Sequence, residues 1–355
     1  MMQRYTILFA LLVLAAAPIA GQVDFRVIGA AQQIDKIMQS DFYIAEIRDD
    51  RDFKANLGIV NRGADFDIKR PLIAEISFFE NLKSRLNGWL LHEEKAVPVV
   101  LRIKELYLWE SLHREREKGT GYIRLNLAFE APGKPAQTIA VTLSGEHLTV
   151  AKGHSPRMED AFFRCLQHYQ ERWENGRFQA EAKPDNLAAE GAGLKAVANF
   201  LDLKKGRHVP FPGKLKRLLG RQERFKLRNR QQREHHAYYA FIDGNEWFIR
   251  GDTYPGGDSY YTRVLEKGRF LFLVDKVRFP LKSTFTEQGI PSGKTVGILI
   301  DMKTGLPQIV TDELVAALIE PYPDLKKKYL FQNILEYPVQ LERVRKVIAE
   351  VNSRR

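Results

Sequence analysis

The sequence predicts an α+β protein of two domains, each an antiparallel sheet packed with amphipathic helices, joined by a basic linker. The 355-residue chain is long enough for two hydrophobic cores. Alternating apolar residues, typical of strands with one buried face, occur on both sides of a segment rich in lysine and arginine. We therefore expect a signal peptide over 1–21, a first domain over 22–178, a basic connection over 179–234 and a second domain over 235–355.

The first residues have the features of a secretory signal peptide. Arg4 precedes an apolar run from Tyr5 to Ala17, and the small residues Ala20 and Gly21 offer a cleavage site before Gln22. The alternative is an uncleaved membrane anchor, but the run is shorter than the roughly 20 apolar residues that a spanning helix needs. We expect a soluble mature protein in the periplasm or outside the cell.

In the first domain, the spacing predicts a helix, three strands and a second helix. The first helix covers 71–91, where apolar residues recur three and four positions apart after Pro71. Alternating apolar residues then predict strands at 97–103, 123–129 and 139–143. The second helix begins after Pro156 and ends near Gly176. Cys165, the only cysteine, lies on its apolar stripe and is expected to be buried.

The connection carries the charge excess of the whole chain. Residues 204–233 contain twelve basic residues and one acid, Glu223, and the formal net charge of the chain is +11. We expect short helices at 194–203 and 214–227, the second with Leu215, Leu218, Leu219 and Phe225 on one side.

A basic amphipathic helix typically binds an anionic membrane surface or an acidic partner protein, although a charge run can also be a solvated linker. The candidate anion-binding residues are the cations of this segment: Lys214, Lys216, Arg217, Arg221, Arg224, Lys226 and Arg228. Nucleic acid is disfavoured as a partner, because the chain is exported and shows no aromatic-lined basic sheet face.

The second domain opens with a predicted hairpin. Asp243-Gly244 lies between alternating apolar residues and favours a two-residue turn. Further strands are expected at 258–265, 268–274, 294–300 and 306–310. Thr311 or Asp312 is expected to cap a helix that stops at Pro321, and Pro338 to open the last helix.

The sequence contains no catalytic signature. It has no Gly-x-Ser-x-Gly motif, and Gly119-Thr120-Gly121 precedes a strand, so it predicts a hairpin turn and not a phosphate-binding loop. No two histidines have the spacing of a helical zinc site, and His235-His236 would need carboxylates supplied by the fold. We assign no cofactor and no metal, and the catalytic residues, if any, are unknown.

The alternative function is a glycan-active hydrolase with its site in the second domain. Such enzymes need two carboxyl groups roughly 5–10 Å apart. Carboxylates and aromatic residues are close together in one stretch: Glu246, Asp252 and Asp258 with Trp247, Tyr254, Tyr260 and Tyr261. The leading interpretation remains an exported, non-catalytic envelope or secreted protein that binds a partner or an anionic surface.

Two resemblances accompany this interpretation. In element order, the first domain resembles the periplasmic auxiliary proteins of bacterial ABC transporters and related small envelope lipoproteins, which implies a non-enzymatic envelope role. The lipid-bearing cysteine of such lipoproteins is missing from this sequence. The second domain resembles a group of uncharacterised exported bacterial proteins through residues 245–252, Asn-Glu-Trp-Phe-Ile-Arg-Gly-Asp, and Thr304-Gly305-Leu306. That likeness implies no activity.

Overall fold

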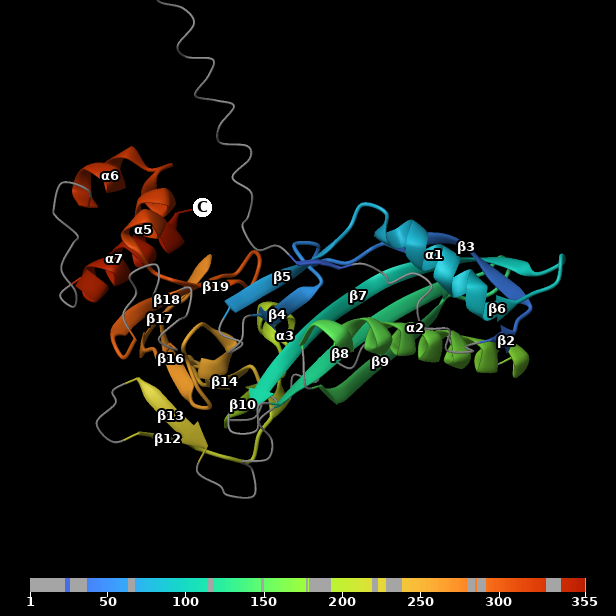
Figure 1. The fold of residues 1–355 in the computed structure, drawn as a ribbon, viewed down its shortest axis with the longest axis horizontal. Coiled ribbons are helices and arrows are strands. Elements are labelled where there is room, and N and C mark those ends of the chain that lie inside the picture. The colour runs from blue at the N-terminus through green and yellow to red at the C-terminus, as the bar shows by residue number, and fades with distance from the viewer. Residues whose placement is uncertain are drawn as a thin grey trace, which may run out of the picture.

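The chain forms two bodies, each built on a sheet, that lie side by side along the long axis of the molecule (Figure 1). The computed structural model describes residues 23–25, 37–62, 68–113, 118–147, 150–176, 178, 193–218, 223–227, 238–279, 285, 292–329 and 340–354. The expected signal peptide over 1–21 lies outside these residues. The first body contains a seven-stranded sheet and the second a ten-stranded sheet. The predicted α+β class is confirmed.

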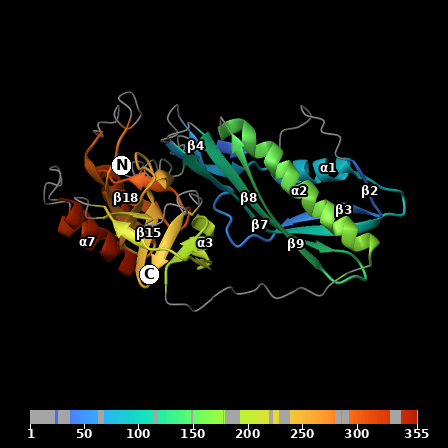
Figure 2. The same cartoon turned by 90° about the horizontal axis from the view of Figure 1, so that it is seen from below.

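The first body is a sheet covered by two helices. Its strands are β1 (Val23–Phe25), β3 (Phe42–Asp49), β4 (Gly58–Arg62), β5 (Ile68–Ala74), β7 (Val97–His113), β8 (Lys118–Glu130) and β9 (Gln137–His147). A small parallel pair, β2 (Met38–Gln39) and β6 (Leu90–Leu91), lies at the far end. The helices α1 (Phe78–Trp89) and α2 (Val150–Glu174) pack on one face of the sheet (Figure 2).

The sheet is antiparallel through β7, β8 and β9, as predicted, but β1–β5, β3–β7 and β4–β7 are parallel pairs. The prediction of a helix from residue 71 is wrong in its first part, because 68–74 form β5. Strand β5 is hydrogen-bonded on both sides, to β1 and to β4, and this pairing favours the extended chain over a helix. The fixed φ of Pro71 suits an extended chain as well as the first turn of a helix. The helix α2 begins before Pro156, at Val150.

Strand β7 changes the face that it presents to the first core. Val99, Leu101 and Ile103 are buried in that core, and a bulge between Ile103 and Glu105 then shifts the register by one residue. Because side chains alternate along a strand, this shift turns the following odd-numbered residues to the opposite side. Tyr107 therefore faces the second body. Gly119–Gly121, predicted as a turn, lie within β8, because the β7–β8 ladder continues as far as His113 and Lys118.

The second body begins earlier in the sequence than expected. Its strands are β10 (Lys195–Val197), β11 (Val209–Pro210), β12 (Leu215–Arg217), β13 (Arg224–Leu227), β14 (Ala240–Asp243), β15 (Glu246–Arg250), β16 (Tyr261–Glu266), β17 (Phe270–Lys276), β18 (Thr295–Asp301) and β19 (Pro307–Ile309). Its helices are α3 (Phe200–Lys204), α5 (Asp312–Ile319), α6 (Pro323–Tyr329) and α7 (Gln340–Ser353), with a 3₁₀ turn at Gly251–Thr253. The basic connection thus contributes four strands to the second sheet.

The helix predicted at 214–227 is wrong, because β12 and β13 form an antiparallel hairpin. Leu215, Phe225 and Leu227 pack on the aromatic cluster around Phe241 and Phe248, and β13 also pairs with β16. Leucine spacing that fits one face of a helix fits one face of this hairpin equally well, and the contacts with the rest of the sheet decide between them. The helix predicted at 194–203 is likewise replaced by β10 and the short α3.

Two local predictions for the second body are confirmed. Asp243 pairs with Glu246 across a tight turn in which Gly244 has φ 53°, a left-handed conformation that favours glycine. The side chain of Thr311 accepts a hydrogen bond from the backbone N–H of Leu314 at 3.3 Å and so caps α5.

Cys165 is fully buried in the first core, as predicted, and burial raises the pKa of its thiol to about 12. We expect it to react with an aromatic disulfide reagent at pH 8 on the order of 1,000-fold more slowly in the folded protein than in urea, because the thiolate is the reactive form. Thiolate release followed by absorbance measures both rates. Equal rates would mean that the thiol is exposed.

Candidate functional site

A cluster of ion pairs around two buried carboxylates joins the two bodies. Glu105 on β7 accepts two hydrogen bonds from the Arg207 guanidinium, each 2.8 Å long, and Asp202 on α3 lies 2.5 Å from Nη1 of Arg124 on β8. Burial opposes ionisation of Glu105, but Arg207, Lys205 and Arg124 outweigh it and lower its pKa. Two cations of the basic segment, Lys205 and Arg207, are therefore already paired with carboxylates of the protein itself.

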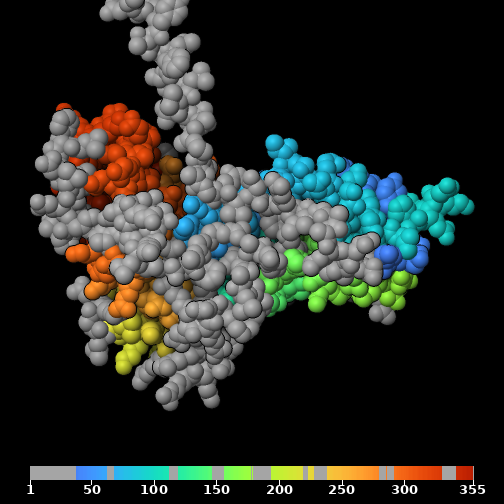
Figure 3. Space-filling model, in the orientation of Figure 1, coloured from blue at the N-terminus to red at the C-terminus, as the bar shows by residue number. Residues whose placement is uncertain are grey.

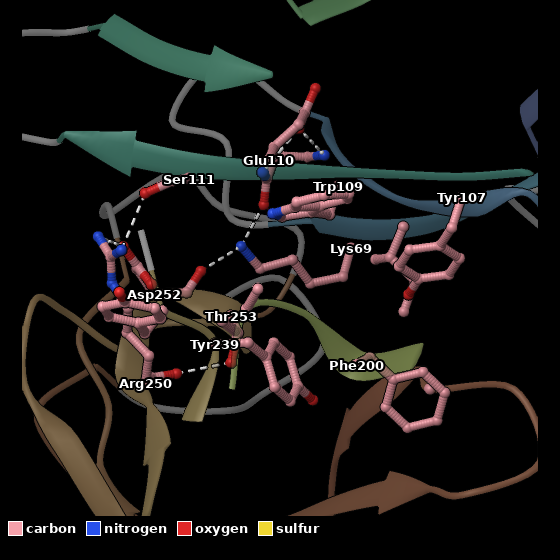
Figure 4. Close-up of a pocket in the computed structure, with 15 residues that line it drawn as sticks. Lys69, Tyr107, Trp109, Glu110, Ser111, Phe200, Tyr239, Arg250, Asp252 and Thr253 are labelled. Atoms are coloured by element: carbon pink, nitrogen blue, oxygen red, sulfur yellow. Dashed lines mark hydrogen bonds and ion pairs between the residues drawn. The ribbon is translucent and has the colours of Figure 1, made fainter. Parts of the chain in front are cut away.

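Beside this cluster, a cavity of about 50 Å³ separates β4, β5 and β7 from the second body (Figure 4). Its walls carry aromatic rings and four charged side chains, which are Lys69, Glu110, Arg250 and Asp252. Lys69 and Arg250 are buried, and Asp252 is 6% exposed. We call this space the junction cavity.

A second cavity, of about 100 Å³, lies beside the β12–β13 hairpin. Four cationic side chains line it, Arg224 and Lys226 from β13 with Lys276 and Arg278 from the end of β17 and the segment after it. Asp258, in the loop between the 3₁₀ turn and β16, is the carboxylate in its lining. We call this space the basic cavity.

Arg224 is a fixed part of the basic cavity's wall. Its Nε donates to Oδ1 of Asp275 at 2.5 Å, and both side chains are buried. The hydroxyl of Tyr254 donates to Oδ2 of Asp275 at 2.8 Å, and that of Tyr260 donates to the same oxygen. Burial and the Asp275 carboxylate raise the pKa of Tyr260. Arg224 is therefore neutralised by Asp275.

The other three cations of the basic cavity are exposed: Lys226, Lys276 and Arg278. Among the residues that the structure describes, none of the three side chains has a carboxylate within ion-pair distance. Lys216 lies directly opposite Lys226 on the hairpin, and like charges in that position repel each other. Asp258 lies in the same lining but forms no ion pair with these side chains, so the surface keeps an excess of positive charge.

The structure places the predicted anion-binding residues in different environments. Lys214, Lys216, Arg217 and Lys226 are exposed on the hairpin, which lies at the surface of the second body (yellow in Figure 3). Arg224 is buried instead, because its charge meets Asp275. Arg221 and Arg228 lie outside the described residues.

Sequence reasoning missed Lys276 and Arg278. They are some 50 residues from the hairpin, and the pairing of β13 with β16, followed by β17, brings them to it. The only local signal is their alternation with the buried Asp275 and Val277 at a strand end.

The carboxylates of the alternative glycan hydrolase do not line one site. Glu246 lies 3.1 Å from Arg263 on an exposed surface, Asp252 lines the junction cavity and Asp258 lines the basic cavity. His235 and His236 lie outside the described residues. Within the part of the chain that the structure describes, no group of three or more histidine, cysteine, aspartate or glutamate side chains could hold a metal ion.

Comparison with solved structures gives partial likenesses. The rare lipoprotein B of Shewanella oneidensis is 16% identical with a TM-score of 0.17, covering 37% of this chain and 92% of that one. A minor lipoprotein of Acinetobacter baumannii is 11% identical with a TM-score of 0.18, covering 40% and 99%. At these TM-scores the likeness carries no argument about function.

No protein-family model and no curated protein matches the sequence. No helix in the described ranges has the length and apolar character needed to cross a membrane.

Proposed function

We propose that this is an exported, non-catalytic envelope protein that binds the phosphate groups of an anionic lipid surface through the basic cavity. The observation that carries the proposal is the set of three cations around that cavity, Lys226, Lys276 and Arg278, facing the single carboxylate of Asp258.

The chemistry of the cavity suits a phosphate. Its volume of about 100 Å³ is enough for one phosphate group. Lysine ammonium groups bind phosphate as point charges, and an arginine guanidinium binds it through two parallel N–H donors. An anion placed between these side chains would also relieve the repulsion between Lys216 and Lys226.

The surroundings suit a surface better than a single soluble ion. Lys216 on β12, with Lys214 just before the strand, continues the positive charge outside the cavity itself. Each lysine or arginine held near an anionic leaflet contributes about 1 kcal/mol. A headgroup in the cavity and neighbouring headgroups along β12 would then be bound together.

Removing the three cavity cations tests the proposal. Sedimentation with phosphatidylglycerol-containing vesicles is expected to show binding by the wild type and about 100-fold weaker binding by the triple variant Lys226→Gln, Lys276→Gln, Arg278→Gln. Phosphatidylcholine vesicles should bind neither protein. Raising the salt from about 0.1 M to about 1 M should abolish binding, because the Debye length falls from about 10 Å to about 3 Å.

The matched control loses the same charge elsewhere. Lys95, Lys327 and Lys346 are exposed and do not line the basic cavity, so their change to glutamine should leave vesicle binding nearly unchanged. If both triple variants lost vesicle binding equally, the loss would follow from the lower net charge alone, and the proposal would be contradicted. If calorimetry showed binding of inorganic phosphate but the protein did not bind vesicles, the ligand would be a free phosphate and not a lipid headgroup. If the protein bound polyglutamate more tightly than vesicles, the partner would be an acidic protein.

A further inference from the structure

We infer that the junction cavity is a second binding site, separate from the basic cavity, and that it takes a neutral, hydroxyl-rich ligand such as the ring of a sugar. This inference is independent of the proposed lipid binding. It comes from the charges, the polar atoms and the rings that surround this space.

The charges in the wall of the junction cavity are balanced. Oδ2 of Asp252 lies 2.5 Å from Nη2 of Arg250, and Nη1 of Arg250 donates to the hydroxyl of Ser111 at 2.8 Å. Lys69 donates to the side-chain oxygen of Asn61 and, at 2.6 Å, to the carbonyl oxygen of Asp252. The amide of Asn61 in turn donates to Glu110 at 2.7 Å.

Two cations and two carboxylates therefore face the same small space. A charged ligand would meet a like charge in this wall and would have to lose its own hydration, which is costly when the charge is not fully paired. A neutral ligand avoids both costs. The wall thus selects against ions of either sign.

Two buried polar atoms in this wall remain available to a ligand. Among the residues that the structure describes, Nε1 of Trp109 has no acceptor, and Oδ2 of Asp252, although ion-paired with Arg250, has no aligned hydrogen-bond donor. An indole N–H can only donate and a carboxylate can only accept. A buried indole N–H without an acceptor is destabilising, so a ligand oxygen that accepts from Trp109 would stabilise the complex. Asp252 is already ion-paired with Arg250, so its second contact would serve mainly to orient the ligand.

A hydroxyl group both donates and accepts, which matches this combination of one donor and one acceptor. The rings of Tyr107, Trp109, Phe200 and Tyr239 surround the same space (Figure 4). Apolar ring faces beside a few polar groups are typical of sites for small organic ligands. The volume of about 50 Å³ admits the edge of one ring with its hydroxyls, not a whole chain of sugars.

The test uses the Trp109 side chain as its reporter. In protein labelled with ¹⁵N at the tryptophan indoles, glucose and N-acetylglucosamine are titrated separately, and the Trp109 N–H signal is assigned by its loss in Trp109→Phe. A neutral sugar should shift this signal saturably. Glucuronate and glucosamine, which carry charges of opposite sign, should bind at least tenfold more weakly.

Two variants separate a specific hydrogen bond from general packing. Trp109→Phe keeps an aromatic ring but removes the N–H, and should weaken sugar binding about three- to tenfold, measured by calorimetry. Trp247→Phe is the matched control, since Trp247 lies on the β14–β15 hairpin beside Lys267 and does not line the cavity. It should bind as the wild type does.

The inference is overturned if neither neutral sugar gives a saturable shift at the Trp109 indole, or if the charged sugars bind equally well. Both outcomes are measured on the wild type. If Trp109→Phe does not fold, the Trp109 signal is assigned by elimination, from the signals lost in phenylalanine variants of the other three tryptophans, Trp89, Trp173 and Trp247. Loss of sugar binding in the Lys226, Lys276 and Arg278 variant is not expected, so failure of this site and failure of the lipid site are distinguishable.

Discussion

Replacing Asp275 with alanine is expected to lower the free energy of unfolding by about 3–5 kcal/mol, which is typical when one partner of a buried ion pair is removed. Asp275 is 3% exposed and accepts hydrogen bonds from Arg224, Tyr254 and Tyr260. The variant would leave the Arg224 charge and two hydroxyls buried without their acceptor. Urea unfolding followed by circular dichroism measures the change.

The control is an ion pair on the surface. Arg48 and Glu46 lie 2.6 Å apart, but their side chains are 44% and 48% exposed. Glu46→Ala should therefore cost less than about 1 kcal/mol. If Asp275→Ala cost no more than this control, the buried cluster would not hold β13 to the end of β17, and the wall of the basic cavity would not be fixed as described.

Alanine at Gly58 is expected to destabilise the protein by at least about 3 kcal/mol, since it combines backbone strain with steric overlap. Gly58 has φ 141°, and a Cβ atom there would lie 1.9 Å from the carbonyl oxygen of Leu108. This is the point where β4 approaches β7, and backbone atoms cannot move aside as a flexible side chain can. Thermal unfolding would report the loss.

The same substitution in α1 should have the opposite sign. At Gly88 a Cβ atom would meet nothing within 4 Å, and the position is helical. Gly88→Ala is expected to raise stability by up to about 1 kcal/mol, because alanine loses less backbone entropy than glycine in a helix. Similar changes in the two variants would show that the β4–β7 approach is not as close as this geometry requires.

The parts of the fold that could be predicted from sequence are those with a local signal. The strand at 123–129 alternates over its whole length, and the Asp243-Gly244 turn and the Thr311 cap depend on residues a few positions apart. The β12–β13 hairpin has no such unique signal. Its leucines suit a helix as well as a strand, and the pairing with β16, about 40 residues later, determines the outcome.

The candidate sites were predicted less completely for the same reason. Lys226 lies in the segment whose charge is evident from composition, but Lys276 and Arg278 reach it only through the order of strands in the sheet. The junction cavity could not be predicted at all. Trp109 follows the bulge after Ile103, which turns the odd-numbered residues of β7 from the first core to the second body. The apolar alternation before Ile103, continued without a bulge, would predict that Trp109 faces the first core.

The reversal within β7 also determines how the two bodies depend on each other. Leu106 and Leu108 belong to the first core, whereas Tyr107, between them, belongs to the second core together with Phe53 and Phe200. A fragment ending at residue 178 would therefore present Tyr107 and Phe53 to water, and a fragment beginning at residue 193 would lack two of its own core residues. We therefore expect the two halves to unfold together in one thermal transition, and neither fragment to fold alone as stably as it does in the whole chain.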